Sequence, residues 1–249
     1  MTITSLLAFI AMHKIWKWSL FISFSITALF LTIDLSFLGS NLTKIASGGW
    51  FPLLVGLGGL LMMTTWKNGR RLLAIQLAKI SLPINTIIAD FNSKKYHKVT
   101  GTAVYMTGNP ELTPPALVEN LKHNKVFHEQ IIILSINILQ TPRLNFEKRV
   151  SLEKLTDHFY RLTAYYGFME QVDVTKLMNN FKRNRHILID LNETSYILGR
   201  ETLIADKSIG MNIWQDKLFM FMSKNSQSAT TYFKVPPKHV FEIGSQVEI

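Results

Sequence analysis

The chain has 249 residues, 27 Lys and Arg side chains against 17 Asp and Glu, and a formal net charge of +10. It contains no cysteine, which excludes disulfides, thiolate zinc sites and a cysteine nucleophile. The basic balance favours attraction to an anionic inner membrane leaflet. No basic run is interleaved with aromatic residues in the way that single-strand-binding proteins require, so nucleic acid is not an expected partner.

The charges are unevenly distributed along the chain. Residues 1–66 contain one acidic side chain, Asp34, and only three Lys or Arg side chains, namely Lys14, Lys17 and Lys44. The other 24 Lys and Arg and 16 Asp and Glu side chains all follow Trp66. This distribution predicts a membrane-embedded front part that is joined to an ordinary polar domain.

Two apolar stretches predict a membrane hairpin. Residues 18–38 supply about the 20 residues that cross a hydrocarbon core at 1.5 Å per residue, with Asp34 as the only charge. Residues 50–66 carry no charge and have tryptophan at both ends, as interfacial anchoring predicts. Neither stretch has the polar face of a soluble helix, and two spans argue against a secretory signal peptide.

Charge also predicts the orientation of this hairpin. Basic residues lie just before the first span and just after the second span: Lys14, Lys17, Lys67, Arg70 and Arg71. The positive-inside rule places these ends in the cytosol, so the loop 39–49 faces outward. Residues 1–17 are expected to be the end of a truncated membrane helix and a cytosolic loop, although the apolar segment 3–12 also fits an interfacial segment.

The rest of the chain predicts a juxtamembrane helix and a cytosolic domain. Residues 67–98 are expected to form a basic helix and a linker with a break at Pro83, and residues 99–249 an α/β domain. Apolar runs and turn residues predict strands at 102–106, 131–139, 159–165, 187–191 and 196–203 and helices at 72–79, 114–125, 174–182 and 214–223. Because strands and helices alternate imperfectly, a mixed sheet is expected.

Several blocks of sequence resemble one family when they are taken in order. These are residues 32–34, 37–44, 48–51, 66–71, 101–106, 114–117, 123–126, 128–129, 166–170, 194–196, 198–202 and 246–249. Their order and spacing are similar to those of the Kup potassium uptake permeases, from about residue 15 to the end of the chain.

The resemblance implies the carboxyl-terminal part of a twelve-span transporter. The hairpin would be its last two spans, and the first nine spans and most of the tenth would lie outside this chain. Kup permeases carry potassium inward, in bacteria together with a proton, across the cell (inner) membrane. The resemblance implies no enzyme activity and no cofactor. The expected partners are the lipid bilayer and the missing spans, and a homodimer is left open.

Asp34 is the candidate ion-binding residue in this chain. A carboxylate inside a membrane span is a functional candidate because burying its charge is costly. Asp34 lies about one turn from the outer boundary, where that cost is smaller, so a hydrogen bond to a partner helix is the alternative. The resemblance places the main ion site among early, partly unwound helices of the missing spans.

The histidine and acidic residues of the polar domain do not predict a metal site. One group has the pattern H-x₄-H-E, which does not place two ligands on one helical face, and a second group suits loop hydrogen bonding better than ligation. The two groups are His123, His128 and Glu129, and His186, Asp190 and Glu193.

A second function class stays open beside the transporter reading. The turn Gly108–Asn109 follows a predicted strand and precedes a helix, which suits an anion nest. The alternative is therefore a membrane-tethered regulatory or nucleotide-binding module that acts independently. A membrane-anchored enzyme is a third hypothesis, but no nucleophile elbow, P-loop or G-x-G-x-x-G motif supports it. Residues 199–202 are interpreted as a tight turn with an ion pair.

Overall fold

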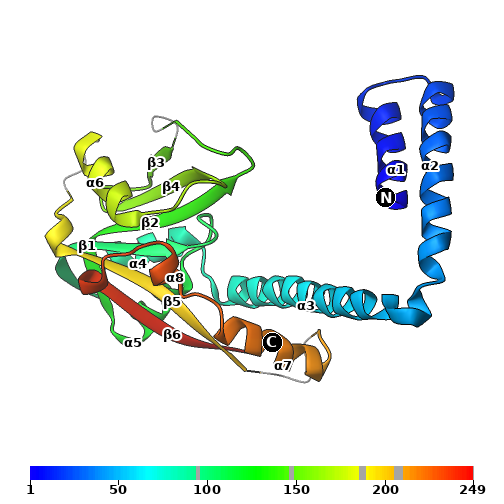
Figure 1. Ribbon diagram of the computed structural model, residues 1–249. Helices are drawn as coiled ribbons and strands as arrows, with labels where there is room; N and C mark the ends of the chain where they lie inside the picture. The colour runs from blue at the N-terminus through cyan, green and yellow to red at the C-terminus, as the bar shows by residue number, and fades with distance from the viewer. Residues whose placement is uncertain (94–95, 146–148, 185–188, 205–209, 249) are drawn as a thin grey trace. The chain divides into compact units, whose positions relative to one another are not determined.

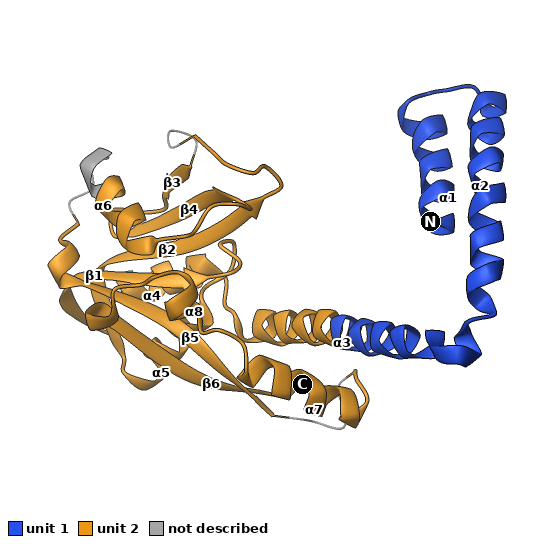
Figure 2. Cartoon of the chain, in the orientation of Figure 1, with its two compact units in different colours: residues 1–64 blue, residues 65–249 orange. Residues whose placement is uncertain are grey.

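The computed structural model describes residues 1–249 except 94–95, 146–148, 185–188, 205–209 and 249. The chain divides into two compact units, Met1–Thr64 and Thr65–Ile249 (Figure 2). The first unit is helical and the second combines helices with a sheet. Each unit is described by itself.

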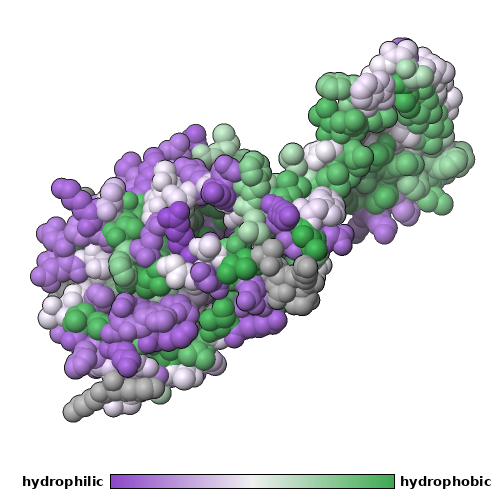
Figure 3. Space-filling view, turned by 90° about the horizontal axis from the view of Figure 1, so that it is seen from below, coloured by the Kyte–Doolittle hydropathy of each residue, from purple (hydrophilic) through white to green (hydrophobic). Residues whose placement is uncertain are grey.

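The helical unit is apolar on most of its surface. It contains α1 (Thr2–Ile10), a π-helical segment (Ala11–Ile15), α2 (Leu20–Leu42), a second π-helical segment (Ile45–Gly49) and the first part of α3 (Trp50–Ile80). The Ser19 hydroxyl accepts a hydrogen bond from the Ile22 N–H at 3.4 Å and so caps the start of α2. Large side chains such as Phe21 and Phe24 are 80% and 63% exposed, and Figure 3 shows apolar surface over these helices.

Helix α3 is longer than the predicted spanning segment. The predicted span 50–66 continues through the predicted basic helix 72–79, and together they form one uninterrupted helix. Pro52 lies in the first turn, where its missing N–H leaves no hydrogen bond unmade. Within the described residues, two helical stretches are long and apolar enough to cross a membrane, Leu20–Leu42 and the one that includes α3.

The second unit is built on a six-stranded mixed sheet. Its strands are β1 (His97–Thr107), β2 (Val126–Leu139), β3 (Val150–Lys154), β4 (Phe159–Gly167), β5 (Thr194–Ile204) and β6 (Val240–Glu248). The order is β3-β4-β2-β1-β5-β6, and all neighbours are parallel except β3, which pairs antiparallel with β4. The chain therefore adds strands on one side of β1 first and then on its other side, so a switch point lies between β1 and β5.

Helices cover both faces of this sheet (Figure 1). The helices of the unit after α3 are α4 (Ile84–Asn92), α5 (Pro115–His123), α6 (Val174–Asn184), α7 (Ile213–Lys224) and α8 (Ala229–Tyr232). Met178 of α6 packs in one core with Val104 and Leu162. On the other face, Phe91 of α4 and Leu117 of α5 pack in a second core with Tyr105. Successive residues of β1 therefore enter opposite cores, as the period of two in a strand requires.

Some predicted elements differ from the structure. Residues 199–202 lie inside β5 rather than in a turn, and Arg200 pairs with Glu242 of the neighbouring strand β6 at 3.4 Å. The predicted strand 187–191 lies partly outside the described residues, and its last residue instead opens a short 3-10 helix, Leu191–Glu193. Strand pairing with β6, which starts about 40 residues later, keeps residues 199–202 extended.

Candidate functional site

Asp34 lies on the face of α2 that packs against α1. The Ser5 hydroxyl of α1 donates a hydrogen bond to Asp34 Oδ2 at 2.5 Å. The Asp34 side chain is buried, as are Ser23 and Thr27 on the same face. Small polar residues let two helices approach closely in an apolar environment, and a hydrogen bond between them adds to their association. The geometry thus gives Asp34 a partner on the neighbouring helix.

The predicted histidine and acidic groups do not come together. His123 on α5 is paired with Glu119 of the same helix at 3.2 Å. His128 and Glu129 are successive residues of β2, so their side chains leave opposite faces of the strand. Burial lowers the pKa of His128, which favours its neutral form. Among the described residues, no three His, Asp or Glu side chains form a group that could hold a metal ion.

In the second group, Asp190 stabilises the segment that leads into β5. The Asp190 carboxylate accepts a hydrogen bond from the Asn192 N–H at 3.0 Å, and the Asp190 carbonyl accepts one from the Thr194 hydroxyl at 2.6 Å. Asp190 thereby caps the 3-10 helix that leads into β5. His186 lies outside the described residues.

Two backbone N–H groups of the turn after β1 form hydrogen bonds within the turn itself. The Asn109 N–H donates to the Thr107 hydroxyl at 3.3 Å, and the Glu111 N–H donates to the Asn109 side chain at 3.0 Å. These two N–H groups are therefore engaged within the turn. An anion nest needs several free amides that converge on one point, so the turn alone does not provide one.

A crevice opens at the carboxyl ends of β1, β2 and β5. Its volume is about 590 Å³, within the range typical of ligand pockets. Met106, Leu134 and Leu198 form its apolar floor, and residues of α3 from Arg70 to Ala78 form one wall. It lies at the switch point of the sheet, where open parallel sheets bind their ligands.

A buried polar side chain beside the crevice has no partner among the described residues. Thr113 immediately precedes the two prolines that open α5, and it is fully buried. Its hydroxyl has no hydrogen-bond partner in the described part of the chain, although it lines the crevice. A buried hydroxyl without a partner is unfavourable. The hydroxyl is shielded from solvent here, so a small molecule in the crevice would reach it only after a local movement.

The crevice was not predicted from the sequence. The turn Gly108–Asn109, which the sequence indicates as a candidate anion nest, is part of its rim. A second signal was present, because Thr113 precedes Pro114 and Pro115 and so stands at the start of a helix that follows a strand. The strand order places the start of this helix near β5, and that order depends on pairing between strands that are distant in the sequence.

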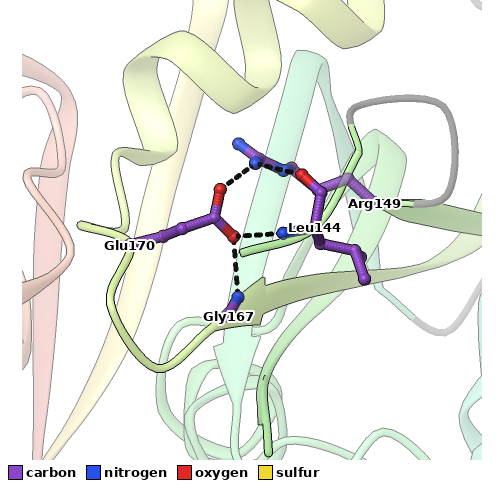
Figure 4. A network of polar contacts seen from close by, with 4 residues as sticks. All are labelled: Leu144, Arg149, Gly167 and Glu170. Carbon is purple, nitrogen blue, oxygen red and sulfur yellow. Dashed lines mark hydrogen bonds and ion pairs between the residues drawn. The ribbon is translucent and has the colours of Figure 1, made fainter. Parts of the chain in front are cut away.

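A separate polar network closes the end of β4 (Figure 4). The Glu170 carboxylate accepts hydrogen bonds from the Gly167 N–H at 2.7 Å and the Leu144 N–H at 3.2 Å. It also forms an ion pair with the Arg149 guanidinium, which in turn donates to the Leu144 carbonyl at 3.2 Å. The Gly167 N–H, followed by the Arg149 charge, lowers the pKa of Glu170 against the opposing effect of burial. The network is structural: it fixes the segment 166–170 and touches no cavity described above.

Family models of potassium transporter domains match both parts of the chain. The family model of the K+ potassium transporter integral membrane domain matches residues 1–71, and that of the K+ potassium transporter C-terminal domain matches residues 100–249. No solved structure matches the chain.

Curated relatives match along the whole chain. A probable potassium transport system protein Kup from Myxococcus xanthus is 43% identical over 249 residues, which is 100% of this chain and 38% of the relative. Proteins of the same name from Caulobacter vibrioides and Bdellovibrio bacteriovorus are 38% and 42% identical, over 100% and 99% of this chain and 37% and 38% of those relatives. The chain spans about two fifths of the length of these relatives. It therefore belongs to the K+ potassium transporter family, with its α/β unit matching that family's carboxyl-terminal domain.

Proposed function

We propose that this chain is the closing part of a Kup-type potassium transporter. In this proposal residues 18–38 and 50–66 are the last two of twelve spans, and the α/β unit lies in the cytosol below the inner membrane. The transporter would carry potassium together with a proton. The observation that carries the proposal is the tandem match, along one chain, to the membrane domain and the carboxyl-terminal domain of potassium transporters.

The proposal assigns a supporting role to the residues of this chain. Asp34 engages Ser5 rather than a group of converging oxygen atoms, and the main ion site is expected in the preceding spans, among broken helices near the midplane. Lipid contacts would cover the exposed apolar side chains of α2 and α3, and the preceding spans would cover the remainder. Whether two transporters associate as a homodimer is left to measurement.

Growth under potassium limitation tests this proposal. Residues 1–249 alone should not rescue a host that lacks potassium uptake. A chimera that joins this chain to the preceding region of the Myxococcus xanthus relative should rescue it. Rescue by residues 1–249 alone would contradict the proposal, as would a chimera that reaches the membrane but takes up no potassium.

The same chimera tests the role of Asp34. If Asp34 serves as a hydrogen-bond acceptor for Ser5, Asp34→Asn keeps the acceptor oxygen and should leave the potassium affinity unchanged. A direct role in binding potassium or a proton would instead raise the KM or shift the pH dependence of uptake. Ser5→Ala provides the control from the other side of the hydrogen bond.

The crevice favours a second candidate function, the binding of a nucleotide regulator by the α/β unit. Its support is the position at the switch point and the unpartnered Thr113 hydroxyl. Equilibrium dialysis of the full chain in detergent with labelled adenosine monophosphate tests it. Thr113→Val, which keeps the volume but removes the hydroxyl, should weaken binding, and Thr141→Val, at an exposed position outside the crevice, is the control. Absence of saturable binding would contradict this second function and leave the transporter proposal intact.

A further inference from the structure

Helix α7 has one buried and one exposed face. Asp216 and Phe219 are 1% and 0% exposed and point into the unit. On the opposite face, Trp214 and Phe221 are 50% and 66% exposed. Their spacing of seven residues places them on the same side of the helix, two turns apart.

Further exposed side chains extend this face. Ile213 is 47% exposed at its start, and Lys217 and Lys224 are exposed between and after the two aromatic residues. We call the set Ile213, Trp214, Lys217, Phe221 and Lys224 the outer face of α7. Single exposed apolar residues are ordinary on protein surfaces. Three of them on one face of a twelve-residue helix, with lysines between them, form a mixed apolar and basic surface.

The position of α7 in the fold adds a second observation. The Phe219 ring contacts Gly69 of α3, and its centroid lies 5.4 Å from that of the Trp66 ring. Trp66 ends the uncharged stretch of α3, and Lys67, Arg70 and Arg71 follow it. These three cations are exposed. Helix α7 is therefore attached to α3 at the turn where apolar sequence gives way to positive charge.

The chemistry of the outer face suits a lipid surface better than a protein. Tryptophan and lysine are typical of the boundary between headgroups and acyl chains, where an aromatic ring is half immersed and a lysine reaches the phosphate layer. Lysine is depleted in the cores of protein–protein interfaces. The outer face of α7 and the adjacent α3 turn together present five Lys or Arg side chains, which complements an anionic leaflet.

We propose that the outer face of α7 docks on the anionic surface of the cytosolic membrane leaflet. Trp214 and Phe221 would insert at the headgroup level, with Lys217 and Lys224 at the phosphates. This inference rests on the proposed membrane location of α2 and α3. It adds a second contact between the α/β unit and the bilayer, beside the covalent connection through α3.

Site-directed spin labelling of the full chain in nanodiscs tests the docking. The chain contains no cysteine, so Phe221→Cys gives a single labelling position. Phe241→Cys on β6 is the matched control, since Phe241 is an aromatic residue that is 50% exposed. Phe24→Cys in α2 is the reference for lipid exposure. Collision rates with oxygen and with a water-soluble nickel chelate report whether each label contacts lipid or water.

The expected result depends on lipid charge. In phosphatidylglycerol-containing nanodiscs, the label at position 221 should be accessible to oxygen and protected from nickel, as at position 24, while position 241 stays accessible to nickel. The protection should be lost in pure phosphatidylcholine and in the Lys217→Glu, Lys224→Glu variant.

The other outcomes overturn the inference in distinguishable ways. Nickel access at position 221 equal to that at 241, with position 24 in lipid, would overturn the docking alone. Protection from both reagents at 221 would indicate a protein contact and also overturn it. Nickel access at position 24 would overturn the membrane location itself, and the docking with it.

Discussion

Glu170 and Asp216 show how strongly two carboxylates of one unit differ in their surroundings. Glu170 receives two backbone N–H groups and the Arg149 guanidinium, so its charge is compensated and its pKa is lowered. Asp216 is 1% exposed, and neither of its carboxylate oxygens has a hydrogen-bond partner within the described ranges. Burial accordingly raises the pKa of Asp216. The first residue stabilises the fold as an anion, whereas the second is unfavourable as an anion.

We expect Glu170→Gln to lower the free energy of unfolding at pH 7 by about 1.5–3 kcal/mol, as for other hydrogen bonds to charged groups. Because the folded-state pKa lies below the unfolded value, this contribution is present above about pH 4.3 and is lost as the pH falls through the folded-state pKa. The difference from wild type should therefore shrink in acid. Urea unfolding in detergent measures it, with Glu242→Gln in the exposed Arg200 pair as a control that costs about 0–1 kcal/mol. Equal losses for the two variants would contradict the assignment.

We expect Asp216→Asn to raise the free energy of unfolding, whereas Glu170→Gln lowers it. A raised folded-state pKa means that stability is greatest below the unfolded value of about 3.9 and is lost as the pH rises through the folded-state pKa. Removing the charge should therefore increase the free energy of unfolding by about 1–3 kcal/mol at pH 8. Thermal unfolding at pH 4 and pH 8 reports the effect, and the exposed Asp157→Asn should change little. A destabilised Asp216→Asn variant at pH 8 would show that the carboxylate is required as an anion.

At the scale of elements, the packing of α7 on α3 depends on one glycine. A Cβ atom added at Gly69 would overlap the Phe219 ring, so no larger residue fits while the ring stays in place. Leu73 and Val247 complete this small core. The family resemblance includes Gly69 in residues 66–71, and the structure supplies a physical reason for glycine there.

Gly69→Ala should weaken the docking of α7 and cost about 1–3 kcal/mol through overpacking. Gly58→Ala, in the same helix and with open space around the added Cβ, should instead be neutral or stabilising by about 0.5–1 kcal/mol. Hydrogen exchange of α7 amides separates the two, because only Gly69→Ala should accelerate exchange there. Restoration of protection by Phe219→Leu in the Gly69→Ala background would confirm the clash as the cause.

At the scale of the whole molecule, the two units have different kinds of surface and so require different surroundings. The α/β unit buries its apolar residues in its cores, whereas α2 and the first part of α3 expose leucine, phenylalanine and methionine side chains around their circumference. Apolar surface of this extent is covered in a functional protein by lipid or by further protein. The unequal distribution agrees with the family of membrane transporters to which the chain belongs.

Topology labelling gives the prediction at this scale. In oriented membranes, Ser40→Cys in the exposed last turn of α2 should react with an impermeant reagent from outside, and the exposed Lys238→Cys in the α/β unit only after the membrane is opened. The reason is the cluster of basic residues at the inner ends of both spans. Labelling of position 40 from the cytosolic side would contradict the orientation. Solubility of the purified chain without detergent would contradict the membrane spans.

Residues with local signals were predicted well. The apolar stretches lie within α2 and α3, and the strands around Ile133 and Leu162 and the helix after Pro114 are present. In contrast, β3 and β6 were not predicted, since β3 has only five residues and β6 reads as a mixed polar segment. The candidate site was predicted least well. The sequence indicated the turn at Gly108 but not the crevice to which this turn belongs.

The amino-acid sequence by itself determined which segments are apolar enough for a bilayer, where the basic residues flank them, and to which family the blocks of residues are similar. These properties are local, because they depend on composition and on spacing along the chain. Only the tertiary structure decided the strand order, the crevice between β1 and β5, the partner of Asp34 and the packing of Phe219 on Gly69. Each of these joins residues from about 30 to 150 positions apart, and the packing that selects such pairs leaves no signal within a single segment.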